Sequence, residues 1–200
     1  MFYYLEGTVA ELGQNLAVLD CGGVGYALNV TTNTLSRLRP GEKSRLYVSE
    51  SIGESNFDLF GFADKSEKRC YEMLVAVSGI GPKAALSILS YNTPEGLALS
   101  IMNSDVKALT VAPGIGKKIA QRVILELKDK ISKEMGDIDF APSAGPVMTA
   151  VSDGNVADAM TALGVLGYSS AEIAPVLKTL DVSGMSAEQI IKAVLRQMVR

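Results

Sequence analysis

Two short stretches of this sequence place glycines, an isoleucine and a lysine in the same order. The first is Val77-Ser-Gly-Ile-Gly-Pro-Lys-Ala-Ala85, and the second is Ala112-Pro-Gly-Ile-Gly-Lys-Lys-Ile-Ala120. The glycines of the second stretch follow those of the first by 35 residues. Each stretch joins the apolar end of one predicted helix, through a Gly-Ile-Gly turn, to a new helix that opens with lysine.

This arrangement suits a phosphate group. Glycine adopts positive φ and lets a ligand approach the backbone closely. The start of the next helix offers N–H groups without intrahelical partners and the positive end of the helix dipole, which together bind phosphate. Lysine, and an arginine one turn further on, would neutralise its charge. The candidate phosphate-binding residues are Gly79, Gly81, Lys83, Gly114, Gly116, Lys117, Lys118 and Arg122.

A single Gly-x-Gly turn is equally typical of an ordinary corner between two helices. Two copies, each with lysine in the first helical turn, favour a repeated functional unit. Both stretches resemble the helix-hairpin-helix motif, which binds the DNA backbone without reading bases. Two such motifs would hold two points along one duplex arm. The alternative without a DNA role is a structural adaptor whose hairpins only pack.

The composition excludes several kinds of chemistry. Histidine is absent from the 200 residues, which rules out Ser-His-Asp and Cys-His nucleophiles and histidine metal ligands. The two cysteines, Cys21 and Cys70, are far apart and lie in no CxxC pair, so we expect free thiols and no metal site. No apolar run approaches the ~20 residues that span a bilayer, and Met1–Val9 does not resemble a signal peptide. We therefore expect a cytoplasmic protein without a membrane role.

The net charge of −3 argues against a nucleic-acid-binding protein, but its distribution does not. Residues 1–63 carry a net charge of −3, residues 64–135 carry +3, and residues 136–200 carry −3. The basic segment is therefore the one that contains both glycine turns.

An enzyme of the helix-hairpin-helix glycosylase or nuclease type is the alternative of a different class. Such enzymes place a catalytic Asp downstream of the hairpin, where this chain has Asp137, and some place a Lys at the position of Ala120. Asp137 falls in a predicted linker, and Trp is absent, which leaves no aromatic-rich pocket for a flipped base. No Gly-x-x-x-x-Gly-Lys-[Ser/Thr] motif occurs, since Val111 stands where its first Gly belongs. We expect no catalytic residues, no cofactor and no intrinsic ATPase activity.

The elements that position the hairpins follow from changes in periodicity, which predict a multi-domain α+β protein. Residues 1–63 read as short strands separated by turn residues, typical of a small β-barrel or sandwich. Residues 64–135 read as helices. Residues 136–154 are rich in Gly, Pro, Ser and Ala without an apolar period and predict a flexible linker. Residues 155–200 predict a three-helix bundle, with helices at 155–166, 170–180 and 187–199.

Several helix ends carry recognisable signals. Asp64-Lys-Ser-Glu67, Ser169-Ser-Ala-Glu172 and Ser186-Ala-Glu-Gln189 have the pattern of a capping box. Pro82 and Pro94 suit the first position of a helix. Ser104 is predicted as an N-cap, and Gly167 as a helix stop.

The whole chain resembles the RuvA family, the DNA-binding subunits of the bacterial branch-migration machinery. The resemblance rests on Gly22-Gly-Val-Gly-Tyr26, on Leu59-Phe-Gly-Phe62 ahead of the two hairpins, and on Ala162-Leu-Gly-Val-Leu-Gly-Tyr168. It implies an N-terminal OB-fold barrel and a homotetramer, or an octamer, that cradles a four-way DNA junction during recombination and repair. It also implies recruitment of a RuvB-type hexameric ATPase by the C-terminal helices and cooperation with a RuvC-type resolvase.

The acidic residues of the barrel segment depart from the family pattern. Members typically carry adjacent Glu and Asp in a hairpin, and these charges meet at the tetramer centre and repel phosphates. Counting back from Phe60 places Glu54 on the Glu position and Ser55 on the Asp position, with Asp58 nearby. The resemblance therefore implies an acidic pin of Glu54 and Asp58, with one charge missing or displaced; otherwise these acids belong to a solvated loop.

The C-terminal segment carries the residues that the resemblance implies in contact with the motor. These are Leu163, Leu166, Tyr168 and Leu195, all on apolar helix faces. The same residues would form the core of so small a bundle, and the sequence leaves open which of them do. A helix face presented to a groove is a common mode of partner binding.

Overall fold

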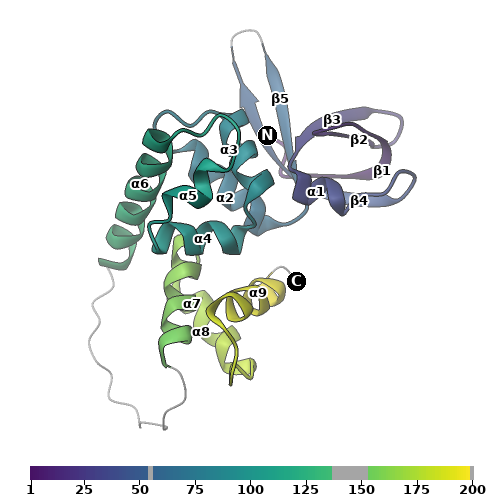
Figure 1. Ribbon diagram of the computed structural model, residues 1–200. Helices are drawn as coiled ribbons and strands as arrows, with labels where there is room; N and C mark the ends of the chain where they lie inside the picture. The colour runs from purple at the N-terminus through teal and green to yellow at the C-terminus, as the bar shows by residue number, and fades with distance from the viewer. Residues whose placement is uncertain (54–55, 137–152, 199–200) are drawn as a thin grey trace.

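The computed structural model describes residues 1–53, 56–136 and 153–198 of the chain. The N-terminal part is a closed barrel in the strand order β1-β2-β3-β5-β4 (Figure 1). Its strands are β1 (Tyr4–Leu12), β2 (Leu16–Asp20), β3 (Gly25–Val30), β4 (Lys43–Ile52) and β5 (Phe57–Phe62). A five-stranded closed barrel of this kind is the architecture of the OB-fold.

The interior of the barrel is filled by every second side chain along the strands. In β2, Ala17 and Leu19 are fully buried, because successive residues of a strand point to opposite faces. All neighbouring strands pair antiparallel except β3 and β5, which pair parallel through Asn29 and Phe60 and so close the barrel. A short helix, α1 (Thr32–Ser36), links β3 to β4 and was not evident in the sequence.

Strands β4 and β5 form a long hairpin. Strand β4 continues to Ile52 and pairs there with Phe57 of β5. The hairpin projects beyond the barrel, on the upper side of Figure 1, where α6 also begins. Cross-strand pairing stabilises residues 49–52 although their own pattern is not typical of a strand.

Helices fill residues 65–136. They are α2 (Lys65–Val75), α3 (Pro82–Tyr91), α4 (Pro94–Met102), α5 (Val106–Thr110) and α6 (Lys117–Gly136). Pro82 and Pro94 open their helices as predicted. The prediction for Ser104 is wrong: Asp105 caps α5 through the N–H groups of Lys107 and Ala108, while Ser104 has φ of 55°. Asp105 is one residue closer to the helix than Ser104 and is itself a favoured N-cap residue.

The C-terminal helices are α7 (Asp153–Val165), α8 (Ser170–Thr179) and α9 (Ala187–Met198). The two capping boxes predicted in this part of the chain are confirmed, at Ser169 with Glu172 and at Ser186 with Gln189. Gly167 ends the first of these helices with φ of 77°. The buried residues of these helices form one continuous core with those of α2–α6, because α7 packs on α4 and α6. A three-helix unit of this size buries little surface alone, and its packing on α4 and α6 enlarges the hydrophobic core that it shares.

The barrel is joined to the helices through a buried carboxyl. Glu67 of α2 accepts hydrogen bonds from the hydroxyls of Thr31 (2.5 Å) and Thr34 (2.6 Å) at the start of α1. The predicted capping box at Asp64 is therefore only half formed. The Asp64 carboxylate does accept the N–H of Glu67, but the Glu67 side chain turns to the barrel instead. Within the described ranges, no helix is long and apolar enough to cross a membrane.

Candidate nucleic-acid interface

The two glycine turns are built alike, down to their backbone hydrogen bonds. In the first, the N–H of Ile80 donates to the carbonyl of Val77 at 3.0 Å. In the second, the N–H of Ile115 donates to the carbonyl of Ala112 at 3.1 Å. Both isoleucines are buried and fasten their turns to the core. The 35-residue spacing of the sequence is thus a spacing between two equivalent hairpins.

The glycines of each hairpin have two different roles. Gly79 and Gly114 have φ of 89° and 83°, a conformation that strains other residues. Gly81 and Gly116 do not have positive φ, and a Cβ built on either would meet no atom within 4 Å. The first glycine of each pair therefore shapes the turn, and the second leaves open space beside the start of the next helix.

The start of α3 offers backbone N–H groups to that open space. Gly81 is its N-cap, and no side chain caps the helix. The first bond of the helix joins the N–H of Ala85 to the carbonyl of Gly81 at 3.0 Å, so the N–H groups of Lys83 and Ala84 precede it. The equivalent first bond of α6 joins Ala120 to Gly116, also at 3.0 Å. Such N–H groups and the helix dipole attract an anion.

Three lysines surround the two helix starts. Lys83, Lys117 and Lys118 are exposed, and none forms an ion pair within the described part of the chain. Their charges are therefore available to an external anion.

Arg122 lies differently from the lysines. Its Nε donates to Glu126 at 2.7 Å, one turn along α6. Its guanidinium lies against the first hairpin, 3.9 Å from the position of a Cβ on Gly79, and Glu126 accepts the N–H of Ser78 at 3.3 Å. Arg122 and Glu126 thus link α6 to the other hairpin, a role that the sequence analysis missed because the two segments are distant in the chain.

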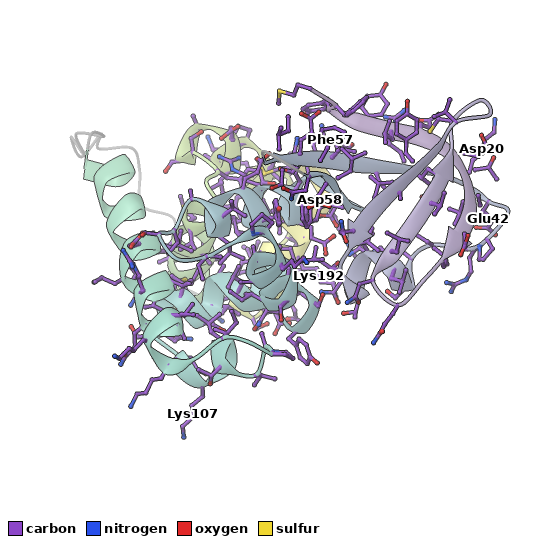
Figure 2. All side chains as sticks on the ribbon, turned by 90° about the horizontal axis from the view of Figure 1, so that it is seen from above. Asp20, Glu42, Phe57, Asp58, Lys107 and Lys192 are labelled. Carbon is purple, nitrogen blue, oxygen red and sulfur yellow. The ribbon has the colours of Figure 1, made fainter. Side chains whose placement is uncertain are left out.

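The candidate acidic pin is only partly visible. Glu54 and Ser55 lie outside the described residues. Asp58 is a residue of β5, opposite Ser51, and accepts a hydrogen bond from the Asn56 side chain at 2.9 Å. Figure 2 shows Asp58 between the far end of the barrel, where Glu42 lies, and the helices, where Lys107 lies. Burial, together with the negative charge of Asp58, raises the pKa of Tyr71.

The candidate motor-binding residues are mostly covered. Leu163, Leu166 and Leu195 are buried in the core that the C-terminal helices share with α2–α6. Tyr168 is partly buried, and the Arg69 guanidinium lies 4.6 Å from its ring centroid. Burial raises the pKa of Tyr168 to about 12.

Only one of the two positions of the alternative glycosylase interpretation lies in the part of the chain that the structure describes. Ala120 is fully buried in α6, and Asp137 lies outside the described residues. Among the residues that the structure describes, no cluster of His, Cys, Asp or Glu has the arrangement of a metal site.

Comparison with protein-family models divides the chain into three matches. Residues 1–61 match the RuvA N-terminal domain, residues 71–129 match a SAM-like helix-hairpin-helix tandem, and residues 154–199 match the RuvA C-terminal domain. The matched segments include both glycine hairpins and the C-terminal helices.

Curated proteins match over nearly the full chain. "Holliday junction branch migration complex subunit RuvA" of Acetivibrio thermocellus is 39% identical, over 100% of both chains. The protein of the same name from Ruminiclostridium cellulolyticum is 37% identical, over 99% of this chain and 100% of its own. That of Streptomyces coelicolor is 42% identical, over 86% of this chain and 82% of its own.

Proposed function

The chain belongs to the RuvA family, and from this premise we propose that it binds four-way (Holliday) DNA junctions as the DNA-binding subunit of a branch-migration complex. The observation that carries the proposal is the pair of equivalent hairpins, each with a positive-φ glycine and an exposed lysine. The role of this chain is recognition of the junction, and ATP-driven movement belongs to a RuvB-type hexameric partner.

The hairpins bind the DNA backbone. The N–H groups near Gly81 and Gly116 donate to phosphate oxygens, and Lys83, Lys117 and Lys118 neutralise phosphate charge. Arg122 contributes less, because Glu126 already engages its guanidinium. Phosphate contacts position a protein without reading sequence. Specificity is therefore for the shape of the junction.

Junction specificity comes from symmetry. A homotetramer, alone or doubled to an octamer, presents one pair of hairpins to each of the four equivalent arms. Glu54 and Asp58 of four subunits gather negative charge at the centre, which repels phosphates and favours strand separation at the crossover. The net charge of +3 on residues 64–135 is repeated around the face that holds the arms.

The four segments have separate tasks in this proposal. Residues 1–63 form the barrel, residues 64–135 bind DNA, residues 136–154 are the linker, and residues 155–200 recruit the motor. Because Leu163, Leu166 and Leu195 are buried, we expect them to act by holding the shape of the C-terminal helices. Tyr168 is the candidate for direct contact with the motor. A RuvC-type resolvase acts on the same junction, in the cytoplasm.

A competition gel shift tests the proposal. The purified chain is mixed with a labelled four-way junction and an excess of linear duplex of the same sequence, at two salt concentrations. We expect junction binding to survive the duplex and to weaken as salt rises. Equal affinity for both DNAs would contradict junction recognition, and binding to neither would favour the structural adaptor.

A further inference from the structure

A groove of about 540 Å³ separates the barrel from α3, next to both hairpins. Gln14 and Asn15, in the turn between β1 and β2, line its barrel side. Lys83 and Tyr91 line its helical side, and Pro113 of the second hairpin lies at its edge. The groove therefore continues the surface that holds the candidate phosphate-binding residues onto the barrel.

The walls of this groove are fixed to one another. The Thr32 hydroxyl donates to the carbonyl of Ser90 at 2.6 Å, and the Asn33 amide donates to that of Leu89 at 2.7 Å, which ties α1 to α3. The Ser87 hydroxyl donates to the carbonyl of Pro113 at 3.0 Å, which ties α3 to the second hairpin. The walls of the groove are therefore preformed. A ligand that binds there loses little free energy to ordering of the protein.

The barrel side of the groove presents free carboxamides on a rigid turn. The N–H of Gly13 donates to the carbonyl of Leu16 at 2.8 Å, and the N–H of Val30 donates to that of Asn15 at 3.0 Å. The side chains of Gln14 and Asn15 are exposed and have no hydrogen-bond partner among the described residues. Their NH₂ groups are thus able to donate hydrogen bonds to a ligand.

The charge and polarity of the lining indicate the ligand. Among the residues that the structure describes, Lys83 is the one cation that lines the groove, and no carboxylate lines it. Apolar side chains such as Phe60 and Leu86 also line the groove, but amides and hydroxyls line both its barrel side and its helical side, as neutral donors and acceptors that an enclosed apolar pocket offers only in small number. Tyr91, which is 57% exposed, adds a flat apolar surface with a hydroxyl at its end. Neutral donors beside a lysine and a flat ring suit a sugar–phosphate backbone.

We propose that this groove takes the backbone of the DNA arm that the hairpins hold, with Gln14 and Asn15 donating to phosphate oxygens and Tyr91 packing on deoxyribose. The inference rests on the proposed function and extends the contact from the helices to the barrel. Each subunit then fixes the direction of an arm relative to the barrel, beyond its two hairpin contacts.

Salt dependence separates these neutral contacts from the lysine contacts. The double variant Gln14→Ala/Asn15→Ala is compared with Lys83→Ala and with Asn103→Ala, an exposed carboxamide at the end of α4 that does not line the groove. Junction affinity is measured by fluorescence anisotropy at several salt concentrations. Removal of two neutral hydrogen bonds is expected to weaken binding about tenfold at every salt concentration.

The slope of log affinity against log salt distinguishes the outcomes. It should not change in the double variant, because no counterion is released by a neutral donor, and should fall by about 0.9 in Lys83→Ala. If the double variant binds the junction with wild-type affinity while Lys83→Ala binds more weakly, the DNA backbone does not occupy the groove. The proposed function would remain intact. Equal binding of junction and duplex by the wild type would contradict the proposed function itself.

Two further measurements test whether the double variant folds and assembles as the wild type does. Thermal unfolding shows whether the double variant folds as the wild type does, which we expect for exposed turn residues. Light scattering gives the oligomeric mass. A changed mass would overturn the proposal by making Gln14 and Asn15 contacts between subunits, and an unchanged mass with weaker junction binding supports it.

Discussion

The hydroxyl of Ser87 donates a hydrogen bond to the carbonyl oxygen of Pro113, 3.0 Å away. Ser87 lies in α3, which follows the first hairpin, and Pro113 lies in the second. Together with Arg122 and Glu126, which reach from α6 to the first hairpin, this bond fixes the relative position of the two hairpins. In the proposed function, two phosphate contacts held at a fixed separation would favour a rigid duplex arm over a flexible strand.

Replacing Ser87 by Ala removes this connection. The free energy of unfolding should fall by about 0.5–1.5 kcal/mol, the usual worth of one hydrogen bond. Urea unfolding measures the decrease, and hydrogen exchange should accelerate in the second hairpin. Ser100→Ala is the matched control, because the Ser100 hydroxyl donates to the carbonyl of Gly96 in its own helix and, within the described ranges, to no other segment. Equal acceleration of the second hairpin in both variants would contradict the role of Ser87.

Substitution of the two kinds of hairpin glycine should separate folding from binding. Gly79→Ala or Gly114→Ala places a Cβ on a residue with positive φ and should lower the free energy of unfolding by roughly 1–2 kcal/mol. Gly81→Ala is free of that strain and meets no atom of the chain within 4 Å. It should leave the melting temperature nearly unchanged but weaken junction binding, since the new methyl occupies the space beside the helix N–H groups. A stable Gly81→Ala variant with wild-type affinity would show that phosphate does not approach there.

The three hairpin lysines should account for much of the salt dependence. Changing Lys83, Lys117 and Lys118 together to Ala is expected to lower the slope of log affinity against log salt by roughly 0.9 for each phosphate that is no longer neutralised. Junction titrations from low to moderate salt give the slope. Lys43→Ala and Lys178→Ala are controls, as both lysines are exposed but lie outside the hairpins. If the controls change the slope as much as the triple variant does, the hairpins are not the DNA-binding surface.

The pH dependence of stability should reveal the buried carboxyl of Glu67. Burial raises its pKa above the ordinary 4.5, although the hydroxyls of Thr31 and Thr34 oppose the shift. A raised pKa in the folded state means that the neutral form favours folding. This contribution is complete below the unfolded-state pKa and is lost as pH rises through the folded-state pKa.

Glu67→Gln keeps the side chain neutral at every pH and retains groups that can bond both hydroxyls. The stability of the wild type relative to this variant should therefore decline as pH rises from about 4.5. Urea unfolding at a series of pH values measures the difference. A difference that grows with pH would contradict the assignment, because it would mean that the folded state favours the charged carboxylate.

The contact of Arg69 with Tyr168 should help to hold the C-terminal helices against α2. A Cβ on Gly167 would approach the Arg69 guanidinium to 2.5 Å, so the arginine also packs closely on the helix end. Arg69→Ala should speed hydrogen exchange in α7–α9 by roughly two- to fivefold, which corresponds to the lower range of cation–π energies. Lys65→Ala is the control, since Lys65 lies over the ring of Tyr47 and not over the C-terminal helices. Unchanged exchange in Arg69→Ala would show that the shared core alone holds these helices.

The sequence by itself determined the features that depend on neighbouring residues. The two hairpins follow from glycine, isoleucine and lysine at fixed short spacings, and the helix starts follow from Pro82, Pro94 and Ser169. Backbone conformation and capping are set within one or two turns of the chain, so local patterns predict them. The same holds for Gly167, where a helix ends in the conformation that glycine favours.

The tertiary structure decided what depends on residues that are distant in the chain. Glu67 looked like half of a capping box, yet two hydroxyls from α1 bind it more than 30 residues away. Leu163 and Leu195 looked equally suited to a partner or a core, and the packing of α7 and α9 on each other and on the middle helices buried them. The groove beside Lys83 arises because α1 and the second hairpin are both bonded to α3. Side-chain type limits what a residue can bond, but the fold decides which partner comes within reach.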